Sequence, residues 1–222
     1  MNARPVALVY RGPASLPGCP EAVAELLRSS LCGFEVHYVG PREKTPLSDA
    51  ALAGAAVYAQ PGGDSLKRGY RHMRRHRDSI RKFVHSGGRY LGFCLGGYLA
   101  GATPGFALLP GDTDQYIASP RATIDSEDNT LVRLRWRGQE RVLFFQDGPY
   151  FWVRPEASVA VMATYPNGTI AAMVSGFGSG RVGVVGPHPE ATQDWYTDAG
   201  LRMTGSLGAD LGHDLVETVM TS

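Results

Sequence analysis

The chain has 222 residues, of which 43% are hydrophobic and 19% are charged, and its formal net charge is +1. This composition excludes a disordered chain, and the near-neutral charge gives no general attraction to nucleic acid or anionic membranes. The length allows a well-packed core, and we expect residues 1–222 to form a single domain.

The chain has three cysteines, Cys19, Cys32 and Cys94. This small, odd number is not typical of a disulfide framework. The N-terminal residues show no signal peptide, and no apolar run approaches the roughly 20 residues that span a bilayer. We therefore expect a cytoplasmic protein with no membrane contact, in which the thiols stay reduced.

In the first half of the chain, short apolar runs alternate with helical patterns. The expected strands are residues 5–10, 33–40, 54–63 and 89–94. The expected helices are residues 19–30, residues 65–85 and a third that begins just after Cys94. This alternation is typical of an α/β domain with a parallel sheet.

The pattern changes after Pro104. Residues 121–151 and 158–190 alternate with a period of two, and the "PNG" at 166–168 is a strong hairpin signal. We expect antiparallel strands here that extend one edge of the sheet or pack beside it. The last residues, 207–222, can form a final helix.

The stretch "GFCLG" at 92–96 has the pattern of a nucleophile elbow with cysteine as the nucleophile. The tight turn from strand to helix requires small residues, which Gly92 and Gly96 provide. Cys94 would be held in a strained conformation, and the backbone N–H of Leu95 would face an incoming carbonyl oxygen. The alternative is that the glycines pack a strand against a helix and Cys94 is a small core residue.

A thiol nucleophile needs a base, and that base needs a group that orients it. His188 follows an apolar strand in "GPHPE", between two prolines, and Glu190 is two residues further on. In an extended segment these two side chains project to the same side, so Glu190 can hold one imidazole nitrogen while the other faces the thiol. The alternative is a rigid loop that carries a surface histidine.

An elbow at the end of a middle strand, followed by "HPE" about ninety residues later, resembles the class I glutamine amidotransferases. The resemblance implies a flavodoxin-like, doubly wound and mostly parallel sheet with helices on both faces. It also implies a triad of Cys94, His188 and Glu190. "QPGGD" at 60–64 resembles the family's glycine-rich turn, which implies a second oxyanion-hole N–H from Gly62 or Gly63.

Four segments, "ALVYRGP", "VYAQPGGDS", "IRKFVHSGGRYLGFCLGGYLAG" and "FFQDGPYF", are more specifically similar to the N-terminal domain of fungal biotin-protein ligases and to stand-alone bacterial proteins. That family implies the fold and a triad but no defined reaction, and biotin ligation is not implied. Glutamine-using relatives usually carry glutamine four residues after the nucleophile, where this chain has Tyr98. Glutamine is therefore a poor fit as substrate.

The resulting expectation is an amide hydrolase or amidotransferase-like enzyme that works through an acyl-enzyme, without metal or organic cofactor. Its expected partners are a small-molecule or peptide amide and a synthase or partner enzyme, and not nucleic acid. The alternative function is a non-catalytic binding or regulatory module.

Three further residues, Tyr98, Gln146 and Asp147, are pocket candidates because of their positions after the elbow and in "FFQDGPYFW". The alternative for the latter segment is an Asp-Gly turn with core aromatics. The basic residues of 66–82 favour a solvated helix face, with an acidic partner as the alternative.

Overall fold

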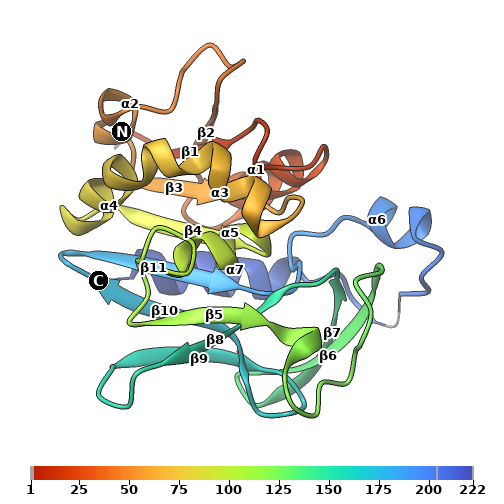
Figure 1. Cartoon of the computed structure of the whole chain (residues 1–222). Coiled ribbons are helices and arrows are strands. Elements are labelled where there is room, and N and C mark those ends of the chain that lie inside the picture. The colour runs from red at the N-terminus through yellow and green to blue at the C-terminus, as the bar shows by residue number, and fades with distance from the viewer. Residues whose placement is uncertain (1–2, 204, 222) are drawn as a thin grey trace.

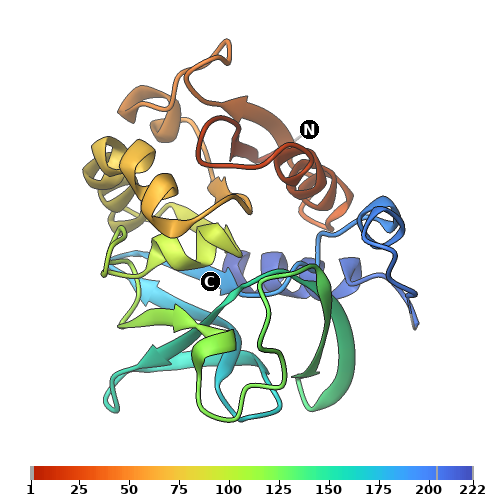
Figure 2. The same ribbon diagram turned by 45° about the vertical axis from the view of Figure 1, so that its right-hand side comes forward.

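The computed structural model describes residues 3–203 and 205–221 (Figure 1). A mixed sheet runs through the molecule in the order β2-β1-β3-β4-β11-β10-β9-β6-β7, and β5 and β8 are attached beside this path. Figure 2 shows the N-terminal elements, in red to yellow, above the antiparallel strands, in green to cyan.

Half of the sheet is parallel. Its strands are β1 (Val6–Tyr10), β2 (Glu35–Val39), β3 (Val57–Gln60), β4 (Arg89–Phe93) and β11 (Gly180–Val185). Each adjacent pair in the order β2-β1-β3-β4-β11 is parallel. Except for the edge strand β2, these strands are largely buried, as expected where helices cover both faces of a sheet. The order matches the flavodoxin-like order, and the expected fold class is confirmed.

The second half of the chain supplies an antiparallel extension of one edge. Its strands are β6 (Thr130–Trp136), β7 (Gln139–Phe145), β8 (Pro149–Val153), β9 (Val159–Thr164) and β10 (Ile170–Phe177). The expected "PNG" hairpin joins β9 to β10, and Gly168 adopts a φ of +87° there. The strand β11 differs from a simple meander, because it is antiparallel to β10 but parallel to β4.

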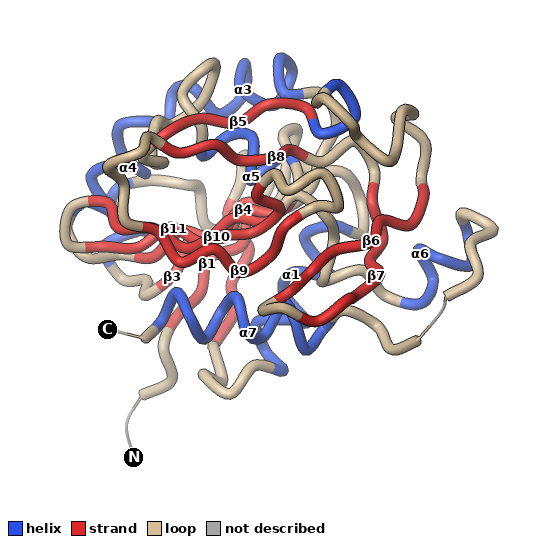
Figure 3. The backbone as a smooth tube through the Cα atoms, turned by 90° about the horizontal axis from the view of Figure 1, so that it is seen from below, coloured by secondary structure: helices blue, strands red, loops and turns tan. Residues whose placement is uncertain are grey.

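Helices cover the two faces of the parallel strands (Figure 3). On one side lie α1 (Cys19–Ser29) and α7 (Ala209–Met220), and Leu27 and Leu215 belong to the same apolar cluster. On the other side lie α2 (Asp49–Ala53), α3 (Leu66–Met73), α4 (Arg77–His85) and α5 (Leu95–Ala100). Their apolar residues form a second cluster, which includes Ile80 and Leu99.

The single helix expected over residues 65–85 was wrong, because the segment is broken. The helices α3 and α4 are separated by a 3-10 turn at Arg74–His76. Their buried residues lie against different partners, since α3 packs on α5 whereas α4 packs on α2 and the sheet. Arg77 interrupts the apolar stripe near the break, so one straight helix would not present both halves to the core.

Several short elements were not expected from the sequence. They are α2, α6 (Gln193–Asp198), the 3-10 turn Tyr116–Ala118 and β5 (Gly111–Gln115). The strand β5 has the polar sequence "GDTDQ" and no apolar alternation, and it is held by antiparallel pairing with β8. Within the described ranges, no helix is long and apolar enough to cross a membrane.

Candidate functional site

The candidate residues follow three neighbouring parallel strands. "PGG" follows β3, Cys94 follows β4, and "GPHPE" follows β11. Because β3, β4 and β11 run in the same direction, their carboxyl ends meet at one edge of the sheet. Ligands of open α/β sheets bind at this edge, so the topology brings together residues that are about ninety positions apart.

Cys94 occupies the turn between β4 and α5. Its φ of 47° and ψ of −103° lie outside the usual regions for a residue with a side chain. Two backbone hydrogen bonds hold it there. The Cys94 N–H donates to the Val185 carbonyl at 3.0 Å, and the Cys94 carbonyl accepts from the Tyr98 N–H at 3.0 Å. The expected strained elbow is therefore present at this cysteine.

The glycines on either side of Cys94 allow the chain to pass this closely. A Cβ atom on Gly92 would lie 2.4 Å from the Gly96 carbonyl oxygen. A Cβ atom on Gly96 would lie 2.0 Å from the Gln60 carbonyl oxygen. Both neighbours are backbone atoms and cannot rotate away, so the turn excludes any side chain at these two positions.

His188 and Glu190 form a buried pair. The Nδ1 atom of His188 and the Oε1 atom of Glu190 are 2.8 Å apart, and the two residues are 3% and 4% exposed. The His188 N–H donates to the Phe144 carbonyl at 2.9 Å, which ties "GPHPE" to the end of β7. The imidazole lies edge-on to the rings of Phe144 and Trp195. His188 is thus a fixed interior group and not a surface histidine.

The surroundings of His188 favour its charged form. Burial alone would lower the pKa of this imidazole, but the carboxylate of Glu190 and the Cys94 side chain raise its pKa to about 10. The hydrogen bond between the ring and Glu190 contributes to this rise in the pKa. The thiol also contacts the Gln146 carbonyl, at 3.6 Å from Sγ to oxygen. Cys94, His188 and Glu190 therefore form one interacting group.

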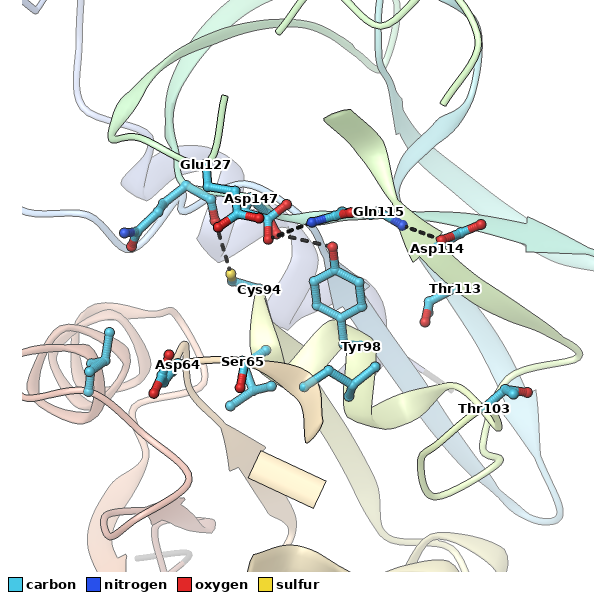
Figure 4. Close-up of a pocket in the computed structure, with 15 residues that line it drawn as sticks. Asp64, Ser65, Cys94, Tyr98, Thr103, Thr113, Asp114, Gln115, Glu127 and Asp147 are labelled. Atoms are coloured by element: carbon cyan, nitrogen blue, oxygen red, sulfur yellow. Dashed lines mark hydrogen bonds between the residues drawn. The ribbon is translucent and has the colours of Figure 1, made fainter. Parts of the chain in front are cut away.

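A cavity of about 450 Å³ opens in front of Cys94 (Figure 4). Its lining includes Tyr98, Gln146 and Asp147, the three residues expected to form a pocket. The Tyr98 hydroxyl donates to the Asp147 carbonyl at 3.1 Å. Burial raises the pKa of Tyr98, so this side chain is a neutral phenol at the cavity wall.

The expected oxyanion-hole residues lie on two sides of the cysteine. Gly63 and Leu95 line the same cavity as Cys94. Gly62 is not in this lining, and a Cβ atom on it would be 2.8 Å from Cε1 of His188. Gly62 therefore leaves room for the imidazole, whereas Gly63 lies at the cavity.

Cys19, to which the sequence assigned no role, is a neighbour of this group. The Cβ position on Gly62 that meets His188 is also 3.3 Å from Sγ of Cys19. Burial, then the charges of Glu190 and Cys94, raise the pKa of the Cys19 thiol. No sequence motif indicates this proximity, since Cys19 begins a helix that only the tertiary fold brings to the site. Cys32 is only partly buried and packs against the core cluster that contains α1 and α7.

The cavity wall also contains residues that sequence reasoning missed. Gln115 donates from Nε2 to Oδ2 of Asp147 at 2.9 Å, and Asp114 and Glu127 lie nearby in the lining. They come from β5 and the long connection after it, which lack apolar periodicity. Among the residues that the structure describes, no group of three histidine, cysteine or acidic side chains is arranged to hold a metal ion.

The sequence profile of the family described as "Biotin-protein ligase, N terminal" matches residues 6–123, more than half of the chain. No curated protein has significant similarity to the sequence. Solved structures with the class I glutamine amidotransferase-like fold resemble it at low identity.

One of these structures is a putative GMP synthase subunit from Thermoplasma acidophilum, with a TM-score of 0.58 and 11% identity over 98% of this chain and 100% of that chain. A GH42 β-galactosidase from G. stearothermophilus has a TM-score of 0.55 and 15% identity over 99% of this chain. The chain spans only 30% of that enzyme's length. A cytoplasmic protein from Salmonella typhimurium LT2 has a TM-score of 0.52 and 14% identity, over 96% and 98% of the two chains. At these identities the likeness concerns the fold alone.

The first prediction concerns the elbow. Gly96→Ala should lower the free energy of unfolding by about 1–3 kcal/mol or more, because its Cβ would collide with the Gln60 backbone. Gly176→Ala is the matched control, since a Cβ there meets nothing within 4 Å, and it should stay within about 0.5 kcal/mol of the parent. Urea denaturation followed by circular dichroism measures both. Equal stabilities of the two variants would contradict the described packing.

The second prediction concerns the charge of His188. Its pKa of about 10 in the folded protein exceeds the ordinary value of about 6.5, so the ring should remain charged through neutral pH. The stability that this shift contributes is fully present below about pH 6.5 and is lost as the pH rises towards 10.

An NMR titration of the His188 Cε1–H signal, assigned by its absence in His188→Gln, should give a midpoint well above neutrality. Glu190→Gln should move that midpoint down, because it removes the neighbouring negative charge. A midpoint near 6.5 that Glu190→Gln leaves unchanged would refute the pairing.

Proposed function

We propose that the chain, which belongs to the biotin-protein ligase N-terminal family, is a cysteine-dependent amide or ester hydrolase or acyltransferase. The residues that match the family profile include the elbow at 92–96. The observation that supports this proposal best is the strained Cys94 beside the buried pair of His188 and Glu190. A residue that only packs a core gains nothing from a costly backbone conformation or from a buried ion pair.

The proposed reaction begins with attack of the Cys94 sulfur on a carbonyl carbon. The sulfur attacks as a thiolate stabilised by the charged His188, a C–S bond forms, and the electron pair of the C=O bond moves to oxygen. Since Glu190 engages Nδ1 of His188, Nε2 is the nitrogen that remains for proton transfer. The backbone N–H groups of Leu95 and Gly63 are the proposed donors to the oxyanion.

Collapse of this intermediate re-forms the C=O bond and breaks the bond to the leaving nitrogen or oxygen. His188 gives its proton to the leaving group, and Glu190 holds the ring in place and stabilises its charge. Water, or an amine, then adds to the thioester and gives a proton to the now neutral His188, and the C–S bond breaks as the Cys94 thiolate is restored. All of these steps use groups of this chain and the substrate.

Glutamine is not the substrate that this site favours. In related glutamine-using enzymes a glutamine side chain occupies the position of Tyr98. Here the phenol hydroxyl already donates to the Asp147 carbonyl, and its ring occupies part of the cavity wall. We propose an amide or ester other than glutamine, bound as a small molecule or a peptide.

The cavity also supports treating residues 1–222 as one domain. Cys94 comes from the first half of the chain, whereas Gln146 and Asp147 come from the second. Neither half would contain the proposed site alone. The free Cys94 thiol, which the reaction requires, persists where thiols are kept reduced.

The third prediction tests the nucleophile. Near neutral pH, iodoacetamide should alkylate Cys94 at least roughly tenfold faster than Cys19 or Cys32, because both of the latter thiols have a pKa raised by burial. His188→Gln should slow the reaction at Cys94, since it removes the positive charge that favours the thiolate. Peptide mapping by mass spectrometry gives the three rates, and melting temperatures verify the fold of the variant.

Slow alkylation of Cys94, at the rate of Cys32 and unaffected by His188→Gln, would favour the alternative function. In that case the chain would be a non-catalytic binding module that uses the elbow for packing.

The fourth prediction tests the acyl-enzyme. With p-nitrophenyl acetate, the protein should release a burst of p-nitrophenol and gain one acetyl group, visible by intact mass. Cys94→Ala should abolish the burst, and Glu190→Gln should reduce the acylation rate by roughly 100-fold, the usual contribution of an oriented acid–base group. Acetylation that persists in Cys94→Ala would place the reaction elsewhere.

A further inference from the structure

The cavity in front of Cys94 has walls of one charge. Four carboxylates lie in its lining, and no lysine, arginine or histidine of the described residues does. The four are Asp64, Asp114, Glu127 and Asp147. The whole chain carries only +1, so this is a local separation of charge and not a property of the composition. A one-signed cavity concentrates ligands of the opposite charge.

The four carboxylates differ in whether a positive side chain offsets their charge. Asp64 forms an ion pair with Arg68, which offsets its charge. In the described part of the chain, no ion pair reaches Asp114, Glu127 or Asp147. Three negative charges therefore remain around the opening of the cavity, and two of them are on exposed side chains.

Asp147 is held in an unusual way. It has a φ of 44°, its carbonyl accepts from Tyr98, and its Oδ2 accepts from Gln115. The other carboxylate oxygen, Oδ1, is fully buried and has no hydrogen-bond partner. A carboxylate oxygen without water or a protein donor is costly, unless a positive group beside it offsets its charge. Burial first, and then the nearness of Glu127, raise the pKa of Asp147, whereas the hydrogen bond from Gln115 lowers it.

Acidic residues also line a neighbouring cavity. A second cavity, of about 590 Å³, is lined by His188 and shares Leu16, Gly63 and Gln146 with the first. Its charged lining residues besides His188 are acidic: Glu21, Glu25, Asp194 and Asp198. Arg11 and Arg28 partly offset Glu21 and Glu25 from outside. An anionic substrate would thus meet acidic side chains in both cavities.

We propose that the substrate carries a cationic nitrogen, a primary ammonium or a guanidinium, which binds beside Asp147 while the scissile carbonyl lies at Cys94. This inference rests on the proposed function and adds the class of its substrate. Asp147 and Glu127 are the specificity-determining residues, and Asp114 adds to the field at the opening. Neutral amides bind without this attraction, and carboxylates are excluded.

The fifth prediction follows from this charge. Methanethiosulfonate reagents transfer an alkylthio group to a cysteine thiolate. The reaction forms a mixed disulfide and releases methanesulfinate. In a Cys19→Ala, Cys32→Ala protein, the aminoethyl reagent should modify Cys94 at least roughly tenfold faster than the sulfonatoethyl reagent, after each rate is divided by that for glutathione. High salt should reduce this preference.

Asp147→Asn and Glu127→Gln should each reduce the preference several-fold, without slowing the neutral methyl reagent. Glu140→Gln is the matched control, because this exposed acid lies outside both cavities and should change nothing. Glu127 is exposed, so Glu127→Gln should fold even if Asp147→Asn does not. Equal rates for the two charged reagents, or a preference that both variants leave intact, would overturn the proposal.

The result is independent of the tests of catalysis. Charge selection at Cys94 requires neither His188 nor turnover. The charge preference can therefore fail while acylation succeeds, and acylation can fail while the charge preference is present. With an active protein, the p-nitrophenyl ester of a 4-aminobutyryl group should have a kcat/KM at least roughly tenfold above that of the succinyl ester. Faster turnover of the succinyl ester would contradict the proposal directly.

Discussion

The contact on which the candidate site depends is the approach of Gly96 to the Gln60 carbonyl oxygen, across the ends of β3 and β4. It lets α5 begin one residue after Cys94, and it fixes the strained backbone of that residue. The constraint is steric, since only a residue without a Cβ atom fits at position 96. Packing of the apolar residues of α5, such as Leu99, against the sheet then stabilises a conformation that the isolated turn would not keep.

The second requirement is the position of β11. This strand leaves the antiparallel extension and enters the parallel sheet beside β4, so that "GPHPE" follows it at the same edge as Cys94. The end of β7 then fixes His188 through its backbone and through Phe144. The extension therefore does more than lengthen the sheet, because it leads the chain into β11, which His188 follows, and it contains the loop with Gln146 and Asp147.

Much of this could be predicted from residue types alone. The parallel strands are apolar runs, and the elbow, "HPE" and "PNG" have local causes that a sequence displays. The break at Arg74–His76 and the strand β5 could not be predicted, because they depend on which surfaces the segments meet after folding. The same holds for Cys19 beside His188 and for the acidic wall, whose residues come from distant segments without a shared motif. The catalytic roles of Cys94, His188 and Glu190 stay predictions that the geometry supports.

Gly62 has a consequence for how relatives of this chain can diverge. Its missing side chain leaves the space into which the imidazole of His188 fits, whereas the elbow depends on Gly92 and Gly96 instead. A single nucleotide change from glycine to alanine at position 62 would displace the histidine and spare the turn. One substitution would thus separate the cysteine turn from the histidine within the same fold, and the residue at this position decides whether a family member with the elbow also has room for the imidazole.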